Sequence, residues 1–537
     1  MRALVLLGLL AACRSPAQPA ASVDARGDVA VDARVEPGPT IGLRLARPGA
    51  SAVDMERALS PVEAALRSAP GLARVEGAAA AGAARLEVTF RPGTTAADAG
   101  RSVADLARPA VPQEMTVEVV PAARWDLRFT LRSDRLSPIE AREIIERIVL
   151  PRLARVPGVA ETSACGGARR EAHVILDAAR LVAAGLGLRD VTAALARTAL
   201  YASPEELGAV RAATRAGVPL RVSDFARIEV GGAPSDCWVA SPAGMVGVGG
   251  RAAVADVGAL VAGDAALEGA RPELPAGVAI ERVPGTSLRL TVRAPAGTRP
   301  PELARIVAAL RDAAPATVAW IYGSGEIELL APAGSVDAVA RALAQVPMVG
   351  PVRTPDDEIR IAVAGADLEP LAAAADAVRA AVASVPGVAA AGTVGASPRA
   401  APRVDVRPDA AALARVGLRP PDLDDYVAAA REGIPAARLR DGDRDIAVVV
   451  RFPDARDDPS ALARLAVPAR GGAIPLASLA QIAADAEPRE ILHRDGERVA
   501  LVWVRAAGGA DRRALVFAVW GAASSARRPA GVRLLGP

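Results

Sequence analysis

Few side chains in this sequence are of a type and spacing suited to chemistry. The 537 residues include two histidines and three cysteines. His173 falls in an expected strand and His493 in a polar, turn-like stretch far away in sequence. Either could act as a base or a ligand, but histidines without a sequence partner most often face solvent, and we expect this of both. No Gly-x-Ser-x-Gly, Cys-x-x-Cys or His-Glu-x-x-His pattern occurs. The sequence therefore predicts neither an enzyme nor a bound cofactor.

Lysine is absent from the chain, and so is asparagine. A P-loop needs a lysine beside the nucleotide phosphates, and Schiff-base or pyridoxal chemistry needs a lysine amine, so both classes are excluded. Basic and acidic side chains are nearly balanced, at 64 and 61. No basic cluster interleaved with aromatic residues occurs, so we do not expect nucleic-acid binding.

The N-terminus has the pattern of a bacterial export signal. Met1-Arg2 is followed by an apolar run and then by Leu10-Ala11-Ala12-Cys13. These last four residues look like a lipobox, in which Cys13 becomes the lipidated first residue. The alternative is an ordinary signal peptide with an incidental cysteine. Arg14 favours the outer membrane, because inner-membrane retention is associated with Asp at that position. Residues 14–39 are rich in Pro, Ala and Ser and predict a flexible tether.

The other two cysteines, Cys165 and Cys237, would lie in an oxidising compartment, where disulfides persist. They could form a disulfide, or each could remain a thiol, and the sequence alone supplies no geometry to decide. Beyond the signal, no uninterrupted apolar run reaches the ~20 residues that a membrane-spanning helix requires. The length is too great for one hydrophobic core, so several domains are expected.

An internal repeat organises the rest of the chain. Asp177 lies eight residues before Gly185-Leu186, and Asp409 lies eight residues before Gly417-Leu418. The tetrapeptide Val-Pro-Gly-Val precedes each copy, at residues 156–159 and 385–388. Each copy resembles a helix and its flanks, so we interpret the two as equivalent structural helices of a duplicated protein.

Around this repeat, the order strand, helix, strand, strand, helix, strand recurs four times. Unit one opens with a strand at Ile41–Ala46 and a helix from Ala52 to Ser68. Unit two has a helix that starts at the capping box of Ser137 and Glu140, and its second half is expected at His173 to Arg197. We place the units at residues 40–121, 122–286, 287–354 and 355–537. The order predicts an α+β fold of four ferredoxin-like βαββαβ units in two duplicated halves.

Four such units in two related pairs resemble the periplasmic porter region of resistance-nodulation-division (RND) efflux pumps, and most of all the heavy-metal and multidrug branches. The resemblance spans roughly residues 40 to 537. The segments that carry it are Arg155–Glu161, Cys165–Gly167, Asp177–Val191, Val385–Val388, Val404–Leu423 and Leu439–Arg444.

The sequence also departs from the RND pattern. Those pumps carry membrane helices before unit one, between units two and three and after unit four, and these hold the proton relay. Here a signal ending at Cys13 takes the first place, and Gly285-Thr286 joins units two and three directly. We therefore expect a porter module without a motor of its own. We also expect a remnant docking subdomain only in the second half, as an insertion at about 431–470, and its loss from the first half.

The resemblance does not supply a binding site. The metal branch uses methionine clusters, but Met55, Met115, Met245 and Met348 match none of them, so we assign no metal. The five tryptophans could line a substrate cleft, although burial within the units is expected for most; they are Trp125, Trp238, Trp320, Trp503 and Trp520.

These features predict a periplasmic lipoprotein, held to the cell envelope through Cys13, that is an accessory or substrate-binding part of an efflux system. A cleft between units one and two, or three and four, would hold a hydrophobic or amphipathic small molecule. Two alternatives remain open: a structural module that binds a pump, a periplasmic adaptor or an outer-membrane duct, and a degenerate permease homologue without transport activity. The sequence identifies no substrate-binding residues and no oligomeric state.

Overall fold

The structure is a computed structural model of the chain. It describes residues 21–23, 29–31 and 38–536, except 48–49, 114, 122–124, 234, 236, 242–243, 284, 292–311, 313–317, 323–325, 333–334, 346–351, 355–357, 396, 398–400, 454–458 and 470–471. Cys13, its signal and most of a helix expected in unit three lie outside these residues. Within the predicted tether, β1 (Ala21–Val23) pairs antiparallel with β2 (Val29–Val31).

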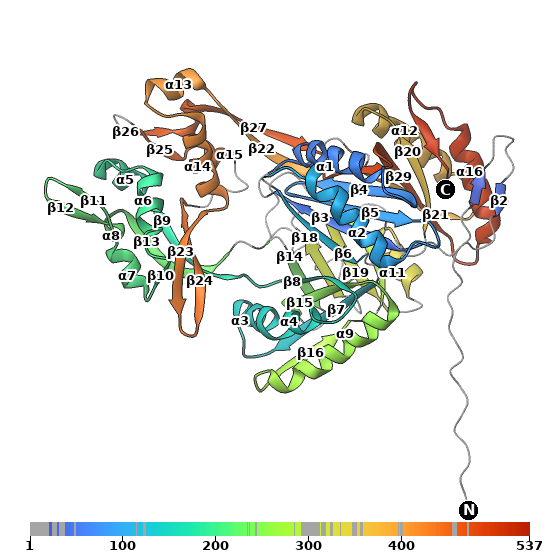
Figure 1. Ribbon diagram of the computed structural model, residues 1–537, viewed down its shortest axis with the longest axis horizontal. Helices are drawn as coiled ribbons and strands as arrows, with labels where there is room; N and C mark the ends of the chain where they lie inside the picture. The colour runs from blue at the N-terminus through green and yellow to red at the C-terminus, as the bar shows by residue number, and fades with distance from the viewer. Residues whose placement is uncertain are drawn as a thin grey trace, which may run out of the picture.

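Unit one is a four-stranded antiparallel sheet in the order β4-β5-β3-β6, with two helices on one face (Figure 1). Its elements are β3 (Thr40–Ala46), α1 (Ala52–Leu66), β4 (Leu72–Ala80), β5 (Ala83–Phe90), α2 (Ala96–Ala107), the 3₁₀ turn η1 (Arg108–Ala110) and β6 (Thr116–Pro121). Ser51 and Thr95 cap the two helices through their side-chain oxygens. Alternate strand residues such as Leu43, Leu45 and Leu86 form the core under the helices, which leaves the opposite sheet face open.

Unit four repeats this order and joins unit one edge to edge. Its elements are β20 (Glu358–Ala364), α12 (Leu368–Ala383), β21 (Val388–Val394), β29 (Glu497–Ala506), α16 (Arg512–Ser525) and β30 (Arg533–Leu535). A short strand, β28 (Glu490–Arg494), forms a hairpin with β29 and pairs with β4 of unit one. The result is one nine-stranded sheet.

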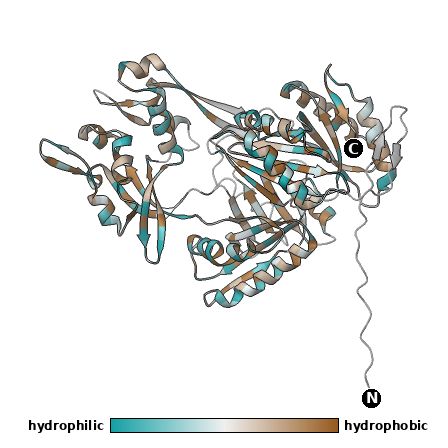
Figure 2. Ribbon diagram, in the orientation of Figure 1, coloured by the Kyte–Doolittle hydropathy of each residue, from teal (hydrophilic) through white to brown (hydrophobic). Residues whose placement is uncertain are grey.

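Units two and three are joined in the same way. Unit two consists of β7 (Trp125–Ser133), α3 (Pro138–Ile144), the π-helical turn η2 (Ile145–Val149), α4 (Leu150–Leu153), β8 (Val159–Cys165), β15 (Gly244–Val254), α9 (Val257–Ala270), the 3₁₀ turn η3 (Arg271–Glu273) and β16 (Val278–Arg282). The described part of unit three has β17 (Thr286–Thr291), β18 (Val318–Tyr322), β19 (Glu326–Ala331) and α11 (Val336–Leu343). The strand β14 (Cys237–Ser241) pairs with both β15 and β18 and makes one eight-stranded sheet. Figure 2 shows hydrophobic residues running through the strands of these sheets.

A third body, which we call the outer module, is built from both halves of the chain and lies to the left in Figure 1. The first half supplies β9 (Arg170–Leu176), α5 (Ala178–Ala184), α6 (Leu188–Leu195), β10 (Leu200–Tyr201), α7 (Pro204–Ala209), β11 (Arg211–Arg215), β12 (Val218–Arg221), α8 (Val222–Phe225) and β13 (Ala226–Gly232). The second half supplies β22 (Ala401–Pro408), α13 (Ala410–Arg415), α14 (Pro420–Arg431), β23 (Ile434–Asp441), β24 (Arg444–Arg451), α15 (Pro459–Ala463), β25 (Ala466–Ala469), β26 (Gly472–Pro475), the 3₁₀ turn η5 (Leu476–Ser478) and β27 (Ala480–Glu487).

The hairpin β23–β24 enters a sheet that otherwise belongs to the first half, in the order β10-β23-β24-β9-β13. One hydrophobic core contains residues of both halves, among them Val174, Phe225, Leu423 and Phe452. The outer module is therefore a single folding unit with an interlocked sheet.

This arrangement corrects two sequence-based predictions. The strand and helices at 170–195 do not complete unit two, whose third strand and second helix are β15 and α9. The first half supplies its own part of the outer module, β9 to β13, and the second-half part runs from β22 to β27 rather than over about 431–470. Local patterns identified the elements, but strand pairing between distant segments decides which sheet each one joins.

The repeat centred on Asp177 and Asp409 is confirmed as two equivalent capped helices. Asp177 Oδ1 accepts hydrogen bonds from the backbone N–H groups of Ala179 and Arg180 at the start of α5. Asp409 Oδ1 accepts the equivalent pair at the start of α13. Among the described helices, none combines the length and the apolar character needed to cross a membrane.

Candidate functional site

A cluster of four ionisable side chains, three of them buried, lies where unit four meets unit one. The helix α1 carries Glu56 and Glu63 on one face, two turns apart, while β28 carries His493 and β29 carries Arg498. His493 Nδ1 lies 2.8 Å from Glu63 Oε2, and its Nε2 lies 2.9 Å from Glu56 Oε1. Arg498 Nη2 donates to Glu56 Oε2 at 2.8 Å. His493 and both glutamates are at most 5% exposed, so the expectation that His493 faces solvent is wrong.

The cluster is held in its charged state. Burial alone would lower the pKa of His493, but its hydrogen bonds to the two glutamates and their negative charges outweigh the burial and raise the pKa to about 9. Burial would likewise raise the pKa of Glu56, but His493 and Arg498 lower it to about 2. Two cations and two carboxylates therefore balance. Because each imidazole nitrogen faces a different carboxylate, the ring has no nitrogen left for a metal ion, and the cluster acts as a clamp between α1 and the β28–β29 hairpin.

A second buried ion pair occupies the equivalent junction between units two and three. Arg128 on β7 is 1% exposed, and its Nη2 donates to Glu328 Oε2 on β19 at 2.7 Å and to Asp126 Oδ2 at 3.2 Å. Its guanidinium also lies 4.9 Å from the centre of the Trp320 ring. Burial opposes the charged forms, yet the carboxylates raise the pKa of Arg128, and Arg128 with Arg289 lowers the pKa of Glu328. This pair fixes unit three against unit two.

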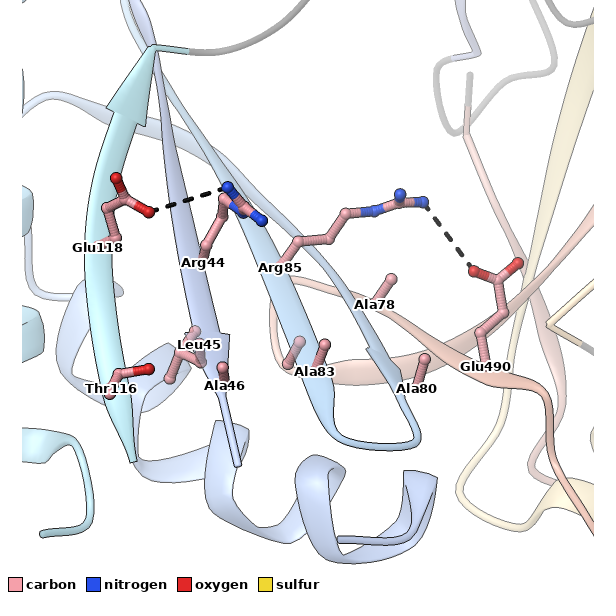
Figure 3. Close-up of a pocket in the computed structure, with 11 residues that line it drawn as sticks. Arg44, Leu45, Ala46, Ala78, Ala80, Ala83, Arg85, Thr116, Glu118 and Glu490 are labelled. Carbon is pink, nitrogen blue, oxygen red and sulfur yellow. Dashed lines mark ion pairs between the residues drawn. The ribbon is translucent and has the colours of Figure 1, made fainter. Parts of the chain in front are cut away.

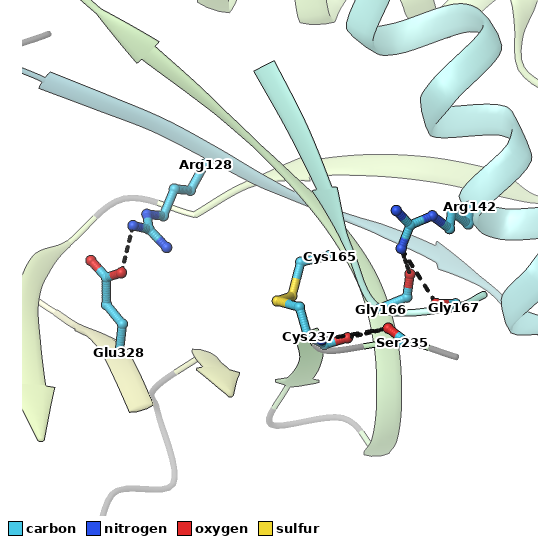
Figure 4. The surroundings of a disulfide bond; sticks show 8 residues. All are labelled: Arg128, Arg142, Cys165, Gly166, Gly167, Ser235, Cys237 and Glu328. Carbon is cyan, nitrogen blue, oxygen red and sulfur yellow. Dashed lines mark hydrogen bonds and ion pairs between the residues drawn. A yellow bond between two sulfur atoms is a disulfide. The ribbon is translucent and has the colours of Figure 1, made fainter. Parts of the chain in front are cut away.

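A disulfide lies beside that ion pair (Figure 4). Cys165, at the end of β8, is bonded to Cys237, at the start of the joining strand β14, with the Cα atoms 5.2 Å apart. The next residue, Gly166, has φ of +81°, and a Cβ there would meet the Gly247 carbonyl oxygen at 2.2 Å. The turn therefore requires glycine, and its carbonyl accepts a hydrogen bond from Arg142 Nη1 at 3.2 Å. The disulfide and the turn anchor the joining strand to unit two.

A solvent-accessible pocket lies on the open face of the unit-one sheet (Figure 3). Its volume is about 300 Å³. The floor is formed largely by alanines, and two arginines and two glutamates stand around it; the lining includes Arg44, Ala46, Ala78, Ala80, Ala83, Arg85, Thr116, Glu118 and Glu490. Arg44 Nη2 also donates to Glu161 Oε1 on β8 of unit two at 2.9 Å. This open-face pocket thus combines apolar and charged contacts at the boundary of three units.

Comparison with known protein families identifies the family that has this architecture. The AcrB/AcrD/AcrF family matches residues 34–200 and 333–533, which is more than half of the chain. The chain belongs to this family. The resemblance to the RND porter region is thereby confirmed.

Two curated relatives and two solved structures are similar to this family member. The cobalt-zinc-cadmium resistance protein CzcA of Cupriavidus metallidurans is 25% identical over 221 residues, and the cation efflux system protein CzcA of an Alcaligenes strain is 24% identical. Each alignment covers 34% of this chain and 21% of the relative, so the chain spans about a fifth of their length. Two crystal forms of a heavy metal efflux pump superpose with TM-scores of 0.78 and 0.76 at 14% identity, covering 93% of this chain and 79% and 80% of theirs. At that identity, the likeness establishes a shared mixed α/β fold.

In this member of the AcrB/AcrD/AcrF family, most residues singled out from the sequence are buried and contribute to packing. His173 is also buried, on the internal strand β9, so the expectation for it is wrong as well. Trp320 and Trp503 are buried, and Met55 and Met115 fill the core of unit one. Within the described ranges, no group of three or more His, Cys, Asp or Glu side chains is arranged to hold a metal ion.

The sequence analysis named His493 and Trp320 but not the contacts that they make in the two junctions, and it missed the residues of the open-face pocket. His493 meets carboxylates more than 400 residues upstream, and Arg128 meets one 200 residues downstream. The available signal was modest: Glu56 and Glu63 stand seven residues apart in an amphipathic helix, and each one faces inward where the 3.6-residue period predicts an apolar residue.

Proposed function

We propose that this AcrB/AcrD/AcrF family member is a porter-domain component of a cell-envelope efflux system, working beside a separate proton-driven pump as an accessory or substrate-binding part. Its place in the family supports a link to efflux, and the relatives named for cobalt-zinc-cadmium resistance and cation efflux support transport across the envelope. In this proposal the chain acts by binding and not by catalysis, in the periplasm.

We further propose that the porter region comprises four ferredoxin-like units. Unit one has the strand order β4-β5-β3-β6, and unit four has the corresponding order β21-β29-β20-β30. Unit two shows the same order in β8-β15-β7-β16. For unit three, the described strands β17, β18 and β19 agree with this description.

The open-face pocket is the observation that supports the substrate-binding role. The pocket is lined by strands of one sheet rather than by loops, and the His493 cluster ties β28 of that sheet to α1. An alanine floor with charged side chains at its margin suits a small amphipathic molecule, because the apolar part gains burial while polar groups fix its orientation.

The test is a fluorescence titration of the purified chain, lacking its signal, with an amphipathic dye. We expect saturable binding with a dissociation constant in the micromolar range. Ala83→Trp, which fills the pocket from an exposed strand position, should weaken binding at least about tenfold. Ala81→Trp is the matched control, because Ala81 lies in the adjacent turn outside the pocket lining. Equal binding by both variants and the unchanged chain would exclude this pocket as the site.

The second candidate function is a structural module that binds a pump, an adaptor or an outer-membrane duct. The outer module favours it, because Val218 on β12 is 60% exposed and Val230 on the edge strand β13 is 40% exposed. If the dye fails to bind but an envelope protein co-purifies with the chain, this reading replaces the first. If neither occurs, the chain is a degenerate permease homologue.

Membrane attachment through lipidated Cys13 completes the proposal. The expected result is that the unchanged chain sediments with membranes, while Cys13→Ala is released into the periplasmic fraction. Retention of Cys13→Ala in the membrane fraction would contradict the lipid anchor.

A further inference from the structure

The open-face pocket has an ordered arrangement of charges that follows from strand register. Arg44 on β3 is directly opposite Arg85 on β5, and Glu118 on β6 is opposite Arg44 on its other side. The neighbouring rung holds Thr116, Ala46, Ala83, Ala80 and then Glu490 of β28. Because side chains alternate between sheet faces, both rungs point away from α1 and α2 into the same space. A charged rung therefore lies beside an alanine rung.

These charges are incompletely satisfied within the protein. Arg85 Nη2 is 4.0 Å from Glu490 Oε2, and Arg44 Nη1 is 3.8 Å from Glu118 Oε2, beyond the ~2.7–3.2 Å of a good hydrogen bond. In the part of the chain that the structure describes, neither Arg85 nor Glu490 makes a side-chain hydrogen bond. Two like charges directly opposite on a sheet also repel. Figure 3 shows Arg85 extended towards Glu490 above the alanines, with a gap between the charged groups.

The geometry excludes a simple cation site. Glu118 and Glu490 stand on β6 and β28, four strand spacings apart, or roughly 19 Å at ~4.8 Å each. They cannot coordinate one metal ion together. A simple anion would be attracted by Arg44 and Arg85 but repelled by Glu118 and Glu490, and these four charged groups sum to zero, so the pocket favours neither sign of charge.

From this pattern we propose that the open-face pocket binds a small zwitterion with an apolar side chain, of the α-amino acid type. Its carboxylate receives hydrogen bonds from the guanidinium of Arg85, its ammonium group donates to Glu490, and its apolar part lies on the alanine rung. A zwitterion satisfies both charges without adding net charge to the pocket. This inference rests on the proposed substrate-binding role and specifies its ligand class.

The experiment is isothermal titration of the purified chain with leucine, leucinamide and 4-methylpentanoate. These probes share the apolar part and carry both charges, only the positive charge and only the negative charge, respectively. Leucine should bind with a micromolar to millimolar dissociation constant, and each single-charge analogue should bind at least about tenfold more weakly. Equal affinity of the three probes, or no heat from leucine up to about 10 mM, would overturn the proposal.

Variants identify the residues involved. Arg85→Gln and Glu490→Gln should each weaken leucine binding at least about tenfold. Arg57→Gln is the control, because Arg57 is an exposed α1 residue paired with Asp54 on the other side of the unit-one sheet. The three variants alter exposed or half-buried side chains, and unchanged thermal unfolding would verify folding. Leucine binding that Arg85→Gln and Glu490→Gln leave intact would overturn the site. Dye binding without leucine binding would overturn this inference alone and leave the proposed function standing.

Discussion

At the scale of single residues, the His493 cluster has the largest energetic consequences. A buried charge pair adds little net stability, but removal of one partner leaves a desolvated charge without compensation. His493 lies between Glu56 and Glu63, and Glu63 hydrogen-bonds to no other side chain that the structure describes. The imidazolium therefore neutralises a carboxylate that is only 2% exposed.

Replacement of His493 by Leu should lower the free energy of unfolding by on the order of 3–5 kcal/mol, because two buried carboxylates would face each other across an apolar side chain. His173→Leu is the matched control. His173 is equally buried, but its single carboxylate contact, with Glu171, is 3.4 Å long, so we expect a change below about 1.5 kcal/mol. Urea denaturation measures the free energy of unfolding of both variants. Equal losses would contradict the role of His493 as a buried charge between Glu56 and Glu63.

The cluster also predicts a pH dependence. The pKa of His493 is raised from 6.5 to about 9, so its contribution is complete below pH 6.5 and is lost as the pH rises through about 9. The pKa of Glu56 is lowered from 4.5 to about 2, so its contribution is present above pH 4.5 and is lost as the pH falls through about 2. Between pH 6.5 and 9.5, the unchanged chain should lose on the order of 3 kcal/mol that His493→Leu does not lose. Parallel pH profiles of the two proteins would refute this.

The Arg128–Glu328 pair leads to a separate prediction. Glu328→Gln should destabilise the chain by on the order of 3–5 kcal/mol, because Arg128 would keep its charge at 1% exposure after losing its shortest carboxylate contact. The double variant Arg128→Met/Glu328→Leu should recover most of the loss. Denaturant midpoints measure the effect, and a double variant less stable than Glu328→Gln would argue against burial of an uncompensated charge as the cause.

At the scale of elements, the joining strands β14 and β28 hold neighbouring units together. Each one connects two units into a continuous sheet, and each lies beside a buried ion pair. The disulfide reinforces only the first of these junctions. The two junctions should therefore respond differently to reduction.

The double variant Cys165→Ser/Cys237→Ser, made in a Cys13→Ala background, should lower the free energy of unfolding by about 4 kcal/mol. The reason is that the disulfide joins residues 72 positions apart and so restricts the unfolded chain. A reducing agent should lower the unfolding temperature of the parent to that of the variant and leave the variant unchanged. A parent that is insensitive to the reducing agent would show that the cysteines are not bonded in solution.

The hairpin β23–β24 holds the outer module together across the two halves. The backbone N–H of Arg438 donates to the Ala199 carbonyl at 3.1 Å, next to the pairing of β23 with β10. Arg438→Pro removes this donor from an internal strand and should cost ~3 kcal/mol. Limited trypsin digestion should then cut at arginines of the outer module before those of the units. Arg438→Ala keeps the N–H and should digest like the parent; identical digestion of the proline variant would contradict the interlocked sheet.

Local features of these elements were predictable from the sequence, and non-local ones were not. The capping box of Ser137 and Glu140 is present as predicted, and α1 ends within two residues of the expected position. Such features depend on neighbours along the chain. The pairing of β24 with β9 and the contact of His493 with Glu63 depend on residues hundreds of positions away, and no local pattern specifies them. The open-face pocket was missed for the same reason, since its lining comes from five strands.

At the scale of the whole molecule, the two halves of the chain are interwoven. The second half supplies β28 to the edge of unit one and β23–β24 to the sheet of the outer module, while the first half supplies β14 to unit three. Neither half can complete its sheets alone. Strands of both halves therefore line the open-face pocket, because β28 of the second half adds Glu490 to the sheet of unit one.

The most direct test of the efflux role is the accumulation of a fluorescent amphiphile in cells of the native host. Cells that lack this chain should accumulate more dye than the parent. The unchanged chain and Ala81→Trp should restore low accumulation, and Ala83→Trp, which fills the pocket, should not. Equal accumulation with and without the chain would contradict its role in efflux, and full restoration by Ala83→Trp would contradict the pocket.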